Sequence, residues 1–572
     1  MTAETIIETL KKMAVYMEFH GMNTFKIRAF KNGAEIVSSI KDELFQRVEA
    51  NTLKEIKGIG AGLESVIKQL VSEGVSTEYE ELKKEIPDTL FDLLKIQGLG
   101  AKKVKLLYDL LGITSVGELE YACKENRLVE LKGFGEKTQK KILKNIEHLN
   151  KFADRFHFHV AKEIADTIST FLDTFPQIIR HQITGSLRRK KETVKDIDIV
   201  ISCLPESVSE IVDTVLKQSF IESVIGSGDT KTSFTHSSGI SVDLRFVTDE
   251  QYPFTIHHFT GSKEHNTEMR SLAKQHGYKL NEYGLFKDET LIPCASEEEL
   301  FKALGLHFIP AECRENVGEL LSAQERPIEG LIEQKDIRGL FHMHTTYSDG
   351  ANSLEEMVRA GIEKGYSYIG ITDHSKSSFY ANGLNEERIF QQFDEIDQLN
   401  KTFPEFKVFK GIECDILHDG SLDYSDDILE QFDFIIASVH QHLSMDKETA
   451  TKRLIKAIEH PSVTMVGHLT GRLLLGREGY PLDMMKVIDA CAANGTMIEL
   501  NCNPHRLDID WRYLLQCREK GVRISINPDA HTISGLDDIQ YGIGLARKGF
   551  LHTSDVFNSL SVNDVDAYFK AS

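Results

Sequence analysis

The sequence predicts a multidomain protein that combines α+β and α/β regions in three successive parts. The first observation is helical periodicity from residue 1 to about 149, where apolar residues recur at three and four positions and proline is almost absent. The second is a change to a period of two in the middle of the chain, in the segments DIDIVIS and ISVDLRFV. The third is the alternation of short apolar strands with helices after Ile337, each strand ending in polar residues. These patterns predict a helical region, a mixed α+β region and a parallel barrel.

Composition narrows the class of protein. The 572 residues are 41% hydrophobic and 27% charged, so the chain is globular rather than fibrous or disordered, and its length suits about three to five domains. No apolar run approaches the ~18 residues that a membrane span needs, and the N-terminus reads as an amphipathic helix rather than a signal peptide. The eight cysteines contain no C-x-x-C pair, which argues against a disulfide framework or a thiolate zinc site. We expect a cytoplasmic monomer that does not bind a membrane.

Taken for the whole chain, the net charge of −21 argues against binding to nucleic acid. Its distribution changes that view, because residues 1–150 carry 23 basic and 23 acidic side chains and the acidic excess lies in the later regions. Contact with DNA would therefore use local basic clusters and backbone amides. Part of the acidic surplus is available to hold metal ions.

A short glycine repeat occurs three times in the helical region, as IKGIG, IQGLG and LKGFG, each time before a helical segment. Glycine allows a tight turn and lets a phosphate approach the N–H groups at the start of a helix. One copy would more often be an ordinary interhelical turn, but three copies indicate a sequence-independent grip on DNA phosphates. Its glycines are Gly58, Gly60, Gly98, Gly100, Gly133 and Gly135. The basic residues downstream are Lys102, Lys103, Lys105, Lys137, Lys140 and Lys141, although for any single lysine a solvated surface position is the plainer interpretation.

Three carboxylates mark the mixed region. In the strand pattern DIDIVIS, Asp196 and Asp198 share one face while the isoleucines occupy the other. Asp243 has the same placement in SVDLRF. Carboxylates that converge repel each other unless divalent cations lie between them, and paired Mg²⁺ ions activate a 3′-hydroxyl and hold triphosphate oxygens. Taken alone, this pattern supports nucleotidyl transfer and a solvated edge strand about equally, and the motifs around the carboxylates decide between them.

The motifs around these carboxylates resemble those of family X DNA polymerases, the family of DNA polymerase beta. The segment Gly185–Arg189 (GSLRR) resembles their glycine-serine turn and arginine, and His258–Ser262 (HFTGS) resembles their Y-F-T-G-S motif. The resemblance covers residues 1–318. It implies helix-hairpin-helix motifs in the N-terminal region and a polymerase beta-like nucleotidyltransferase palm.

The resemblance also implies residue roles. Asp196, Asp198 and Asp243 would be the catalytic carboxylates that hold two Mg²⁺ or Mn²⁺ ions, with Asp243 activating the primer hydroxyl. The residues implied in nucleotide binding are Ser186, Arg189, Arg155, Gly261, Ser262, Asn266 and Arg270. Two positions depart from the family pattern: His258 stands where tyrosine is common, which bears on sugar selectivity, and Val66 stands where lyase-competent members carry a Schiff-base lysine, so no lyase activity is expected.

The C-terminal region carries the densest set of metal-ligand residue types. Each lies at the end of a predicted strand or on the loop that follows it: His342, His344, Asp349, His374, Glu413, His440, His468, Asp529 and His531. A single histidine at such a place is more often a structural residue than a ligand. Six histidines and three carboxylates together are hard to explain by packing and predict a multinuclear metal site.

This pattern resembles the polymerase and histidinol phosphatase (PHP) domain, a (β/α)7 barrel, and fills all nine positions of its ligand pattern. Nitrogen and oxygen ligands suit Mn²⁺, Zn²⁺ or Fe, up to three ions, and the sequence does not choose among them. A bridging hydroxide in such a centre would attack phosphorus. Arg472 and Arg506 are candidate phosphate clamps, and a structural salt bridge is an equal alternative for each.

These assignments divide the chain as follows: a helical DNA-end-binding domain with the first hairpin at 1–80, a subdomain with two further hairpins at 81–150, the palm at 151–245, a nascent-base-pair subdomain at 246–318, a linker at 319–337 and the PHP domain at 338–572. The linker prediction rests on a polar stretch interrupted by Pro327 and Gly330.

The order and length of these parts resemble the bacterial PolX family. The resemblance implies a DNA repair polymerase that fills short gaps from dNTPs on DNA with gaps or recessed 3′ ends. Its PHP domain would be a Mn²⁺-dependent 3′→5′ exonuclease, and 3′-phosphatase or abasic-site (AP) endonuclease activity stays open.

Two rival interpretations remain. The PHP domain could be a small-molecule phosphoesterase tethered to a polymerase, which comparing a 3′-recessed duplex with histidinol phosphate as substrates would test. Alternatively, the chain could be a non-catalytic DNA-binding scaffold. Complete ligand sets speak against the scaffold, because a degenerate site should have lost ligands.

Overall fold

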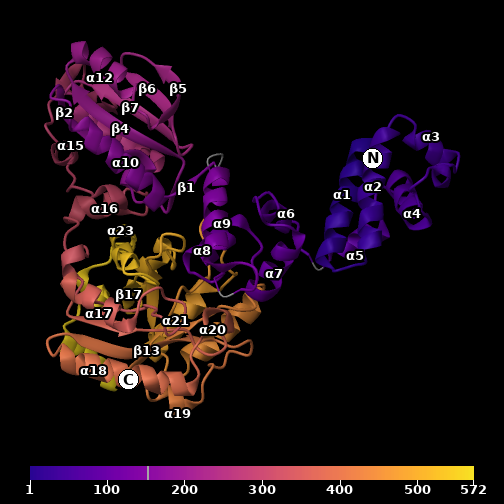
Figure 1. Cartoon of the computed structure of the whole chain (residues 1–572). Helices are drawn as coiled ribbons and strands as arrows, with labels where there is room; N and C mark the ends of the chain where they lie inside the picture. The colour runs from indigo at the N-terminus through magenta and orange to yellow at the C-terminus, as the bar shows by residue number, and fades with distance from the viewer. Residues whose placement is uncertain (85, 130, 151–153, 572) are drawn as a thin grey trace. The chain divides into compact units, whose positions relative to one another are not determined.

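The computed structural model describes residues 1–84, 86–129, 131–150 and 154–571 (Figure 1). The chain divides into two compact units: Met1–Cys123 with Glu136–Ile146, and Lys124–Gly135 with the residues from Glu147 onward. Among the described residues, no helix is long and apolar enough to cross a membrane. The sequence predicts a domain boundary between residues 150 and 151. Residues 151–153, on its C-terminal side, lie outside the described residues.

The described residues among the first 150 are mainly helical, as the periodicity predicts. The first helix begins after Thr2, whose hydroxyl accepts a hydrogen bond from the N–H of Thr5 at 3.2 Å. Its buried face includes Ile6, Leu10 and Met13, which recur at helical spacing. The helices are α1 (Ala3–Phe19), α2 (Thr24–Ser39), α3 (Leu44–Glu49), α4 (Ala61–Ser72), α5 (Thr77–Lys83), α6 (Leu90–Leu93), α7 (Ala101–Leu111), α8 (Val116–Lys124) and α9 (Gly135–Asn150).

A five-stranded sheet of order β2-β4-β7-β6-β5 forms the next part of the second unit. Strands β4 and β7 are parallel, and their register places Asp198 opposite Asp243. The isoleucines of β4 are fully buried, so its carboxylates occupy the opposite face. The elements are β1 (Phe156–His157), α10 (Phe158–Leu172), β2 (Ile178–Ile183), α11 (Gly185–Arg188), β3 (Thr193–Val194), β4 (Asp196–Cys203), α12 (Val208–Val215), β5 (Ile221–Ser227), β6 (Lys231–His236) and β7 (Ser241–Val247).

A smaller α+β part follows with its own apolar core, which includes Phe254, Leu300 and Phe301. Its elements are α13 (Tyr252–Thr260), α14 (Lys263–Gln275), β8 (Tyr278–Asn281), β9 (Gly284–Lys287), β10 (Thr290–Ile292), α15 (Glu297–Ala303) and α16 (Glu319–Glu325). Helix α16 belongs to the segment that composition marks as a linker. Its apolar residues Leu320 and Ala323 are buried in the same core, so this half of the segment is packed.

The C-terminal part is a parallel barrel, as the strand pattern predicts. Its seven strands follow chain order from β11 to β17, and a parallel bridge between Met343 and Ala530 links the ends beyond β11 and β17. The strands are β11 (Gly339–Leu340), β12 (Tyr368–Ile371), β13 (Lys407–Asp415), β14 (Phe434–Ser438), β15 (Met465–Val466), β16 (Met497–Asn501) and β17 (Ile524–Asn527).

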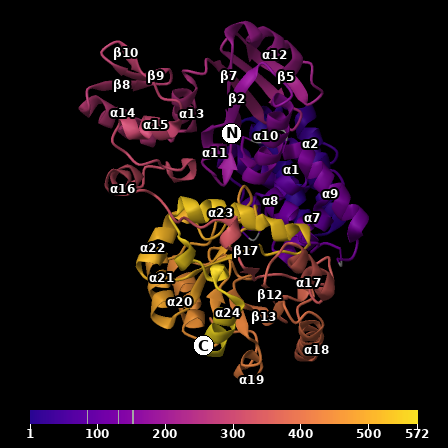
Figure 2. The ribbon, with the colours of Figure 1, turned by 90° about the vertical axis from the view of Figure 1, so that its left-hand side faces the viewer.

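Helices surround these strands. Figure 2 shows α17 and α18 on one side of them and α20, α21 and α22 on the other. The helices are α17 (Leu354–Glu363), α18 (Glu386–Thr402), α19 (Asp426–Leu429), α20 (Lys447–Ile458), α21 (Met484–Asn494), α22 (Leu514–Glu519), α23 (Ile539–Lys548) and α24 (Val562–Ala571). Phe569 of α24 stacks on Phe434 at a ring distance of 5.2 Å and helps fill the barrel interior. With the interior filled by apolar side chains, the polar residues lie at the carboxyl ends of the strands.

Candidate functional site

All nine histidines and carboxylates predicted from the C-terminal sequence converge at the carboxyl ends of the barrel strands. Their nitrogen and oxygen atoms form four overlapping groups, and in each group the atoms lie within 4.8 Å of one another. The groups are His344, Asp349, His374 and His531; His342, Glu413 and His468; His342, His344 and Asp529; and His374, Glu413 and His440. The side chains of all nine are 5% exposed or less.

Glu413 lies at the centre of the cluster. Its Oε1 is 2.8 Å from Nε2 of His468 and 3.1 Å from Nε2 of His440, and its Oε2 is 2.9 Å from Nδ1 of His374. Burial raises the pKa of this carboxyl, but His440, His342 and His374 outweigh that effect and hold it well below its usual value. An ionised carboxylate among several histidines could serve as a ligand to cations bound there.

Asp349 and Asp529 each lie close to a different histidine of the cluster. Oδ1 of Asp349 is 3.4 Å from Nε2 of His531, and Oδ1 of Asp529 is 3.3 Å from Nε2 of His344. Burial, together with the charges of His531 and His374, lowers the pKa of His344 to about 3, so this imidazole is neutral at pH 7. A neutral imidazole is the form that ligates a metal.

Several atoms that face the centre make no hydrogen bond to the described residues. They are Nε2 of His342, His374, His440 and His531, both ring nitrogens of His344 and Oδ2 of Asp349. A buried polar atom without a partner is costly, and metal coordination would remove that cost. The donor set therefore fits a multinuclear cation centre of the nitrogen- and oxygen-preferring class.

Two carboxylates that sequence reasoning missed hold the outer sides of these histidines. Glu499 of β16 contacts Nδ1 of His342 at 2.5 Å, and Asp415 of β13 contacts Nδ1 of His440 at 3.0 Å. Each orients a ring whose Nε2 faces the cluster. A signal was present for both: Glu499 interrupts an apolar strand, and Asp415 shares the face of Glu413 two residues earlier.

The two candidate phosphate clamps have different surroundings. Nε of Arg506 lies 3.5 Å from Oδ2 of Asp529, at the edge of the cluster. The guanidinium of Arg472 bonds to Oδ2 of Asp510 at 3.0 Å and donates to the backbone carbonyls of Arg506 and Leu507. These contacts favour the salt-bridge alternative for Arg472.

The palm brings its three carboxylates together on neighbouring strands. Asp243 accepts a hydrogen bond from the hydroxyl of Ser233 at 2.6 Å and pairs with Nζ of Lys231 at 2.7 Å. Burial, reinforced by the charges of Asp196 and Asp243, raises the pKa of Asp198 to about 6. This repulsion is what a bound divalent cation would relieve.

The glycine-serine turn of the palm approaches these carboxylates closely. Gly185 has φ +66°, and a Cβ there would lie 2.6 Å from Oδ2 of Asp198. Ser186 follows in α11, and Arg189 at its end donates from Nε to Glu315 at 3.1 Å and from Nη1 to the carbonyl of Thr260.

The HFTGS segment packs against that arginine. A Cβ on Gly261 would lie 2.9 Å from Nη1 of Arg189, and the hydroxyl of Ser262 accepts from the N–H of His265 as the cap of α14. Asn266 donates to the carbonyl of His258 at 2.7 Å. Direct contacts thus join the arginine to the motif, and Gly185 places the turn against Asp198.

Two further predicted nucleotide-binding residues have local partners. Arg155 donates from Nη2 to the carbonyl of Thr193 at 2.6 Å, and from Nε to the hydroxyl of the same residue. Nη2 of Arg270 lies 3.4 Å from the hydroxyl of Thr267, one turn earlier in α14. These contacts attach Arg155 to β3 and Arg270 to its own helix.

The three glycine repeats share one backbone geometry. Gly58, Gly98 and Gly133 have φ of 104°, 97° and 93°, which only glycine adopts readily. The next residue in each turn donates its N–H to the residue two before the glycine, at 3.0–3.1 Å. Gly60 and Gly100 then cap α4 and α7, and Gly135 begins α9. Each turn therefore presents the start of a helix to a phosphate. Of the lysines that follow, Lys105 pairs with Asp109, and Lys140 pairs with Glu136 at 2.6 Å.

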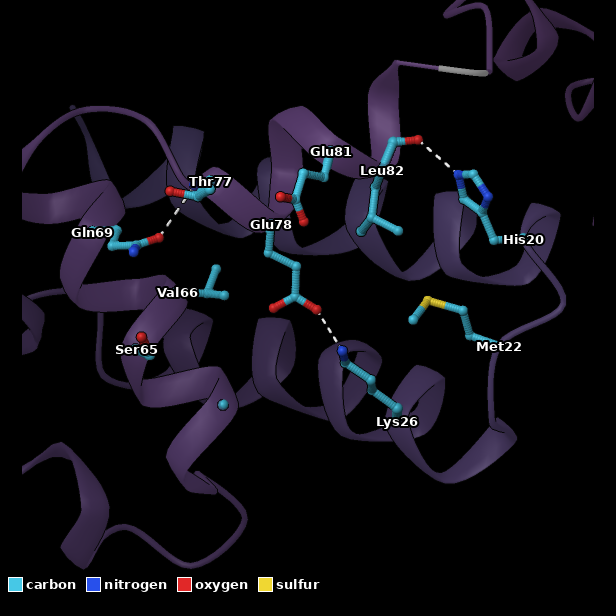
Figure 3. A pocket seen from close by; sticks show the side chains of 11 residues that line it. His20, Met22, Lys26, Ser65, Val66, Gln69, Thr77, Glu78, Glu81 and Leu82 are labelled. Carbon is cyan, nitrogen blue, oxygen red and sulfur yellow. Dashed lines mark hydrogen bonds and ion pairs between the residues drawn. The ribbon is translucent and has the colours of Figure 1, made fainter.

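A cavity of about 690 Å³ lies in the first unit, next to α4. Figure 3 shows Val66 facing this cavity, with Lys26 on the opposite wall paired to Glu78 at 2.5 Å. The cavity holds an apolar side chain at the position where a Schiff-base lysine would stand. Nearby Lys68 pairs with Glu64 at 2.7 Å, one turn earlier in α4.

Four models of known protein families match parts of the chain. A helix-hairpin-helix domain matches residues 1–76, and a SAM-like helix-hairpin-helix tandem matches residues 90–147. The DNA polymerase beta thumb matches residues 255–315, and the PHP domain matches residues 341–503.

Individual relatives agree with this order. The chain is 43% identical over 574 residues to the DNA polymerase/3′-5′ exonuclease PolX of Bacillus subtilis (strain 168), with 100% of both chains covered. It is 28% identical to a probable phosphatase of Thermoanaerobacter sp. (strain X514), over 40% of this chain and 93% of the relative. It is 33% identical to a repair DNA polymerase X of African swine fever virus, over 22% of this chain and 75% of the relative.

Proposed function

The chain belongs to the PolX family of DNA polymerase/3′-5′ exonucleases, and from this premise we propose that it repairs DNA by trimming a 3′ end and then extending it from dNTPs across a short gap. The observation that carries the proposal is that one chain holds a buried cluster of metal-ligand residues in the barrel and, in the palm, carboxylates on neighbouring strands with Asp198 opposite Asp243. A small-molecule phosphoesterase is not favoured for the barrel, because the full-length relative is named as an exonuclease.

The palm performs nucleotidyl transfer. Asp196, Asp198 and Asp243 would hold two Mg²⁺ or Mn²⁺ ions, which activate the primer hydroxyl and neutralise the triphosphate when bound. Asp243, which accepts a hydrogen bond from Ser233, would activate the primer hydroxyl. The turn at Ser186 would face the triphosphate, because its first residue, Gly185, lies against Asp198. Arg189, whose guanidinium contacts Glu315, is assigned to the same ligand by its place in this motif.

The barrel hydrolyses the phosphodiester bond. Its nine residues would hold up to three ions, for which we propose Mn²⁺, and these ions supply a hydroxide nucleophile and charge stabilisation when bound. Glu413 keeps the histidines together, and the ring nitrogens of His342 and His440 are held toward the centre by Glu499 and Asp415. Arg506 lies where it can bind a phosphate oxygen.

The glycine turns bind the DNA backbone without sequence preference, through N–H groups at helix starts. The substrate is therefore duplex DNA with a gap or a recessed 3′ end. We propose the domain limits given above: 1–80 and 81–150 for the helical parts, 151–245 for the palm, 246–318 for the nascent-base-pair subdomain, 319–337 for the connection and 338–572 for the barrel.

A second candidate activity for the barrel is removal of a 3′-phosphate. It is favoured by the probable phosphatase of Thermoanaerobacter sp., which matches 40% of this chain over 93% of its own length. The same centre would serve both reactions, because each attacks a phosphorus at a 3′ end.

The test is a time course on a 5′-phosphorylated gapped duplex with Mn²⁺, with and without dNTPs, on primers ending in 3′-OH or 3′-phosphate. We expect Asp196→Ala/Asp198→Ala to lose extension and keep 3′ shortening, and His342→Ala/His344→Ala to do the reverse. Shortening that survives loss of both histidines would show that the barrel is not the nuclease. Phosphate release in the wild type but not in the histidine variant would assign the second activity to the same centre.

A further inference from the structure

A segment outside the barrel reaches the barrel's metal-ligand cluster. Lys124–Gly135, which follows α8, belongs to the same compact unit as the barrel. Glu125 in this segment is only 5% exposed, and Leu128 is fully buried. A buried carboxylate so far from the barrel in sequence requires a partner, because burial of an unpaired charge is costly.

The partner of Glu125 is a predicted metal ligand. Its Oε2 forms an ion pair with Nδ1 of His531, and its Oε1 lies 3.4 Å from Nδ2 of Asn503. The other ring nitrogen of His531, Nε2, faces Oδ1 of Asp349 at 3.4 Å, inside the cluster. His531 is thus held from outside on one nitrogen while the other points to the centre.

Two histidines of the barrel have the same arrangement, in which one ring nitrogen contacts an outer carboxylate and the other faces the cluster. Nδ1 of His342 contacts Glu499 and Nδ1 of His440 contacts Asp415, while Nε2 of each ring faces Glu413 at 3.3 and 3.1 Å. Glu125 stands in the same relation to His531 as these two carboxylates do to their histidines. An outer carboxylate fixes the ring orientation and raises the basicity of the ligating nitrogen.

Neighbouring side chains fix the segment in place. Nζ of Lys124 contacts Nε2 of His505 at 2.8 Å. The guanidinium of Arg127 lies over the ring of Tyr380 at 5.6 Å, and its Nε is 3.9 Å from Oδ2 of Asp349. Contacts to several different barrel loops make the position of Glu125 a specific one.

From this geometry we infer that Glu125 is a positioning residue of the nuclease metal centre, supplied by the segment before the third glycine turn rather than by the barrel. The inference rests on the proposed ligation of a cation by His531. Removing the carboxylate should leave His531 in place but less well oriented, and metal affinity should fall about 10- to 100-fold.

The test is Mn²⁺ binding by the full-length protein after metal removal with a chelator. Free Mn²⁺ is followed by electron paramagnetic resonance, for wild type, Glu125→Gln, Glu125→Asp and His531→Ala. Glu355→Gln, which breaks an exposed pair with Arg359 on α17, is the matched control. We expect affinity at one site to fall in the order wild type, Glu125→Asp, Glu125→Gln, with the control equal to wild type.

The outcomes separate the two ideas. If His531→Ala weakens Mn²⁺ binding and Glu125→Gln does not, the inference is wrong and the proposed ligation stands. If His531→Ala binds as wild type does, the ligation itself fails. The rise in Tm on adding Mn²⁺ is a second readout that a purely structural role would not move: it should be smaller in Glu125→Gln than in wild type, and an equal rise would overturn the inference even if the metal-free variant is less stable.

Discussion

At the scale of single residues, Asp198 shows how a site can oppose the stability of its own fold. Burial is the largest cause of its raised pKa of about 6, and the charges of Asp196 and Asp243 add to it. A carboxyl in an unfolded chain titrates near 3.9. The folded state therefore keeps its proton to higher pH than the unfolded state, and stability is lost as pH rises from about 4 through 6.

Replacing Asp198 by asparagine should remove this cost in the metal-free protein. We expect Asp198→Asn to be more stable than wild type at pH 8 by roughly 2–3 kcal/mol at most, and nearly equal to it at pH 4. Urea unfolding in the presence of a chelator measures the difference. Asp213→Asn, an exposed carboxylate on α12, is the control. A variant no more stable than wild type at pH 8 would show that the repulsion is relieved without metal.

Ligand residues at strand ends were predicted from the sequence, whereas the carboxylates that support them were missed. His342 or Glu413 can be recognised because a polar residue after an apolar strand has a known destination in a parallel barrel. Glu499 lies inside a strand, and only the barrel's closure turns it toward His342. Glu125 is further removed, since nothing in its local sequence distinguishes it from a solvated helix-end carboxylate.

At the scale of elements, the second and third glycine turns combine a φ that favours glycine with an open surface. A Cβ on Gly98 would meet no atom within 4 Å, so glycine is needed there for its φ of 97° and not for space. The same holds for Gly133. This combination suits a turn whose N–H groups must be reached by a phosphate.

Gly98→Ala should therefore weaken DNA binding without unfolding the protein. The strain of about 1–2 kcal/mol would shift the turn and the N–H groups that follow it, and affinity for a gapped duplex should fall several-fold by fluorescence anisotropy. Gly112→Ala is the matched control, because Gly112 ends the next helix with φ of 65° and also has open space. Equal losses in both variants would mean that strain alone, and not the phosphate grip, is responsible.

Elements with strong periodicity were predicted well from sequence. The six apolar segments after Ile337 that alternate with helices all form barrel strands, because parallel strands buried on both faces read as apolar runs. Helix α16 was less evident, since its short apolar pattern is masked by surrounding polar residues. Its packing depends on a core supplied by α13 to α15, which local sequence does not reveal.

At the scale of the whole second unit, one lysine joins three parts of the chain. Lys548 ends α23 of the barrel, is fully buried, and places Nζ 2.5 Å from Oε1 of Glu315 and 2.8 Å from the carbonyl of Arg189. Glu315 in turn accepts from Nε of Arg189 at 3.1 Å. Sequence reasoning missed this network, because a lysine at the end of a helix ordinarily complements the helix dipole at the surface.

Lys548→Met should therefore affect the polymerase from within the nuclease barrel. Among the described residues, loss of the ammonium leaves Glu315 paired with Arg189 and Lys191. We expect this change to shift the guanidinium of Arg189 and to make the proposed triphosphate site less positive. We expect KM for dNTPs in gap filling to rise several-fold while the rate of 3′ shortening stays unchanged, because the metal-ligand residues of the barrel are untouched. The control is Lys456→Met on α20. It removes an exposed ion pair with Asp419 and should change neither activity. If KM is unaltered and only Tm falls, Lys548 contributes to packing and not to nucleotide binding. A raised KM would show that the barrel helps to set the affinity of the palm for nucleotides.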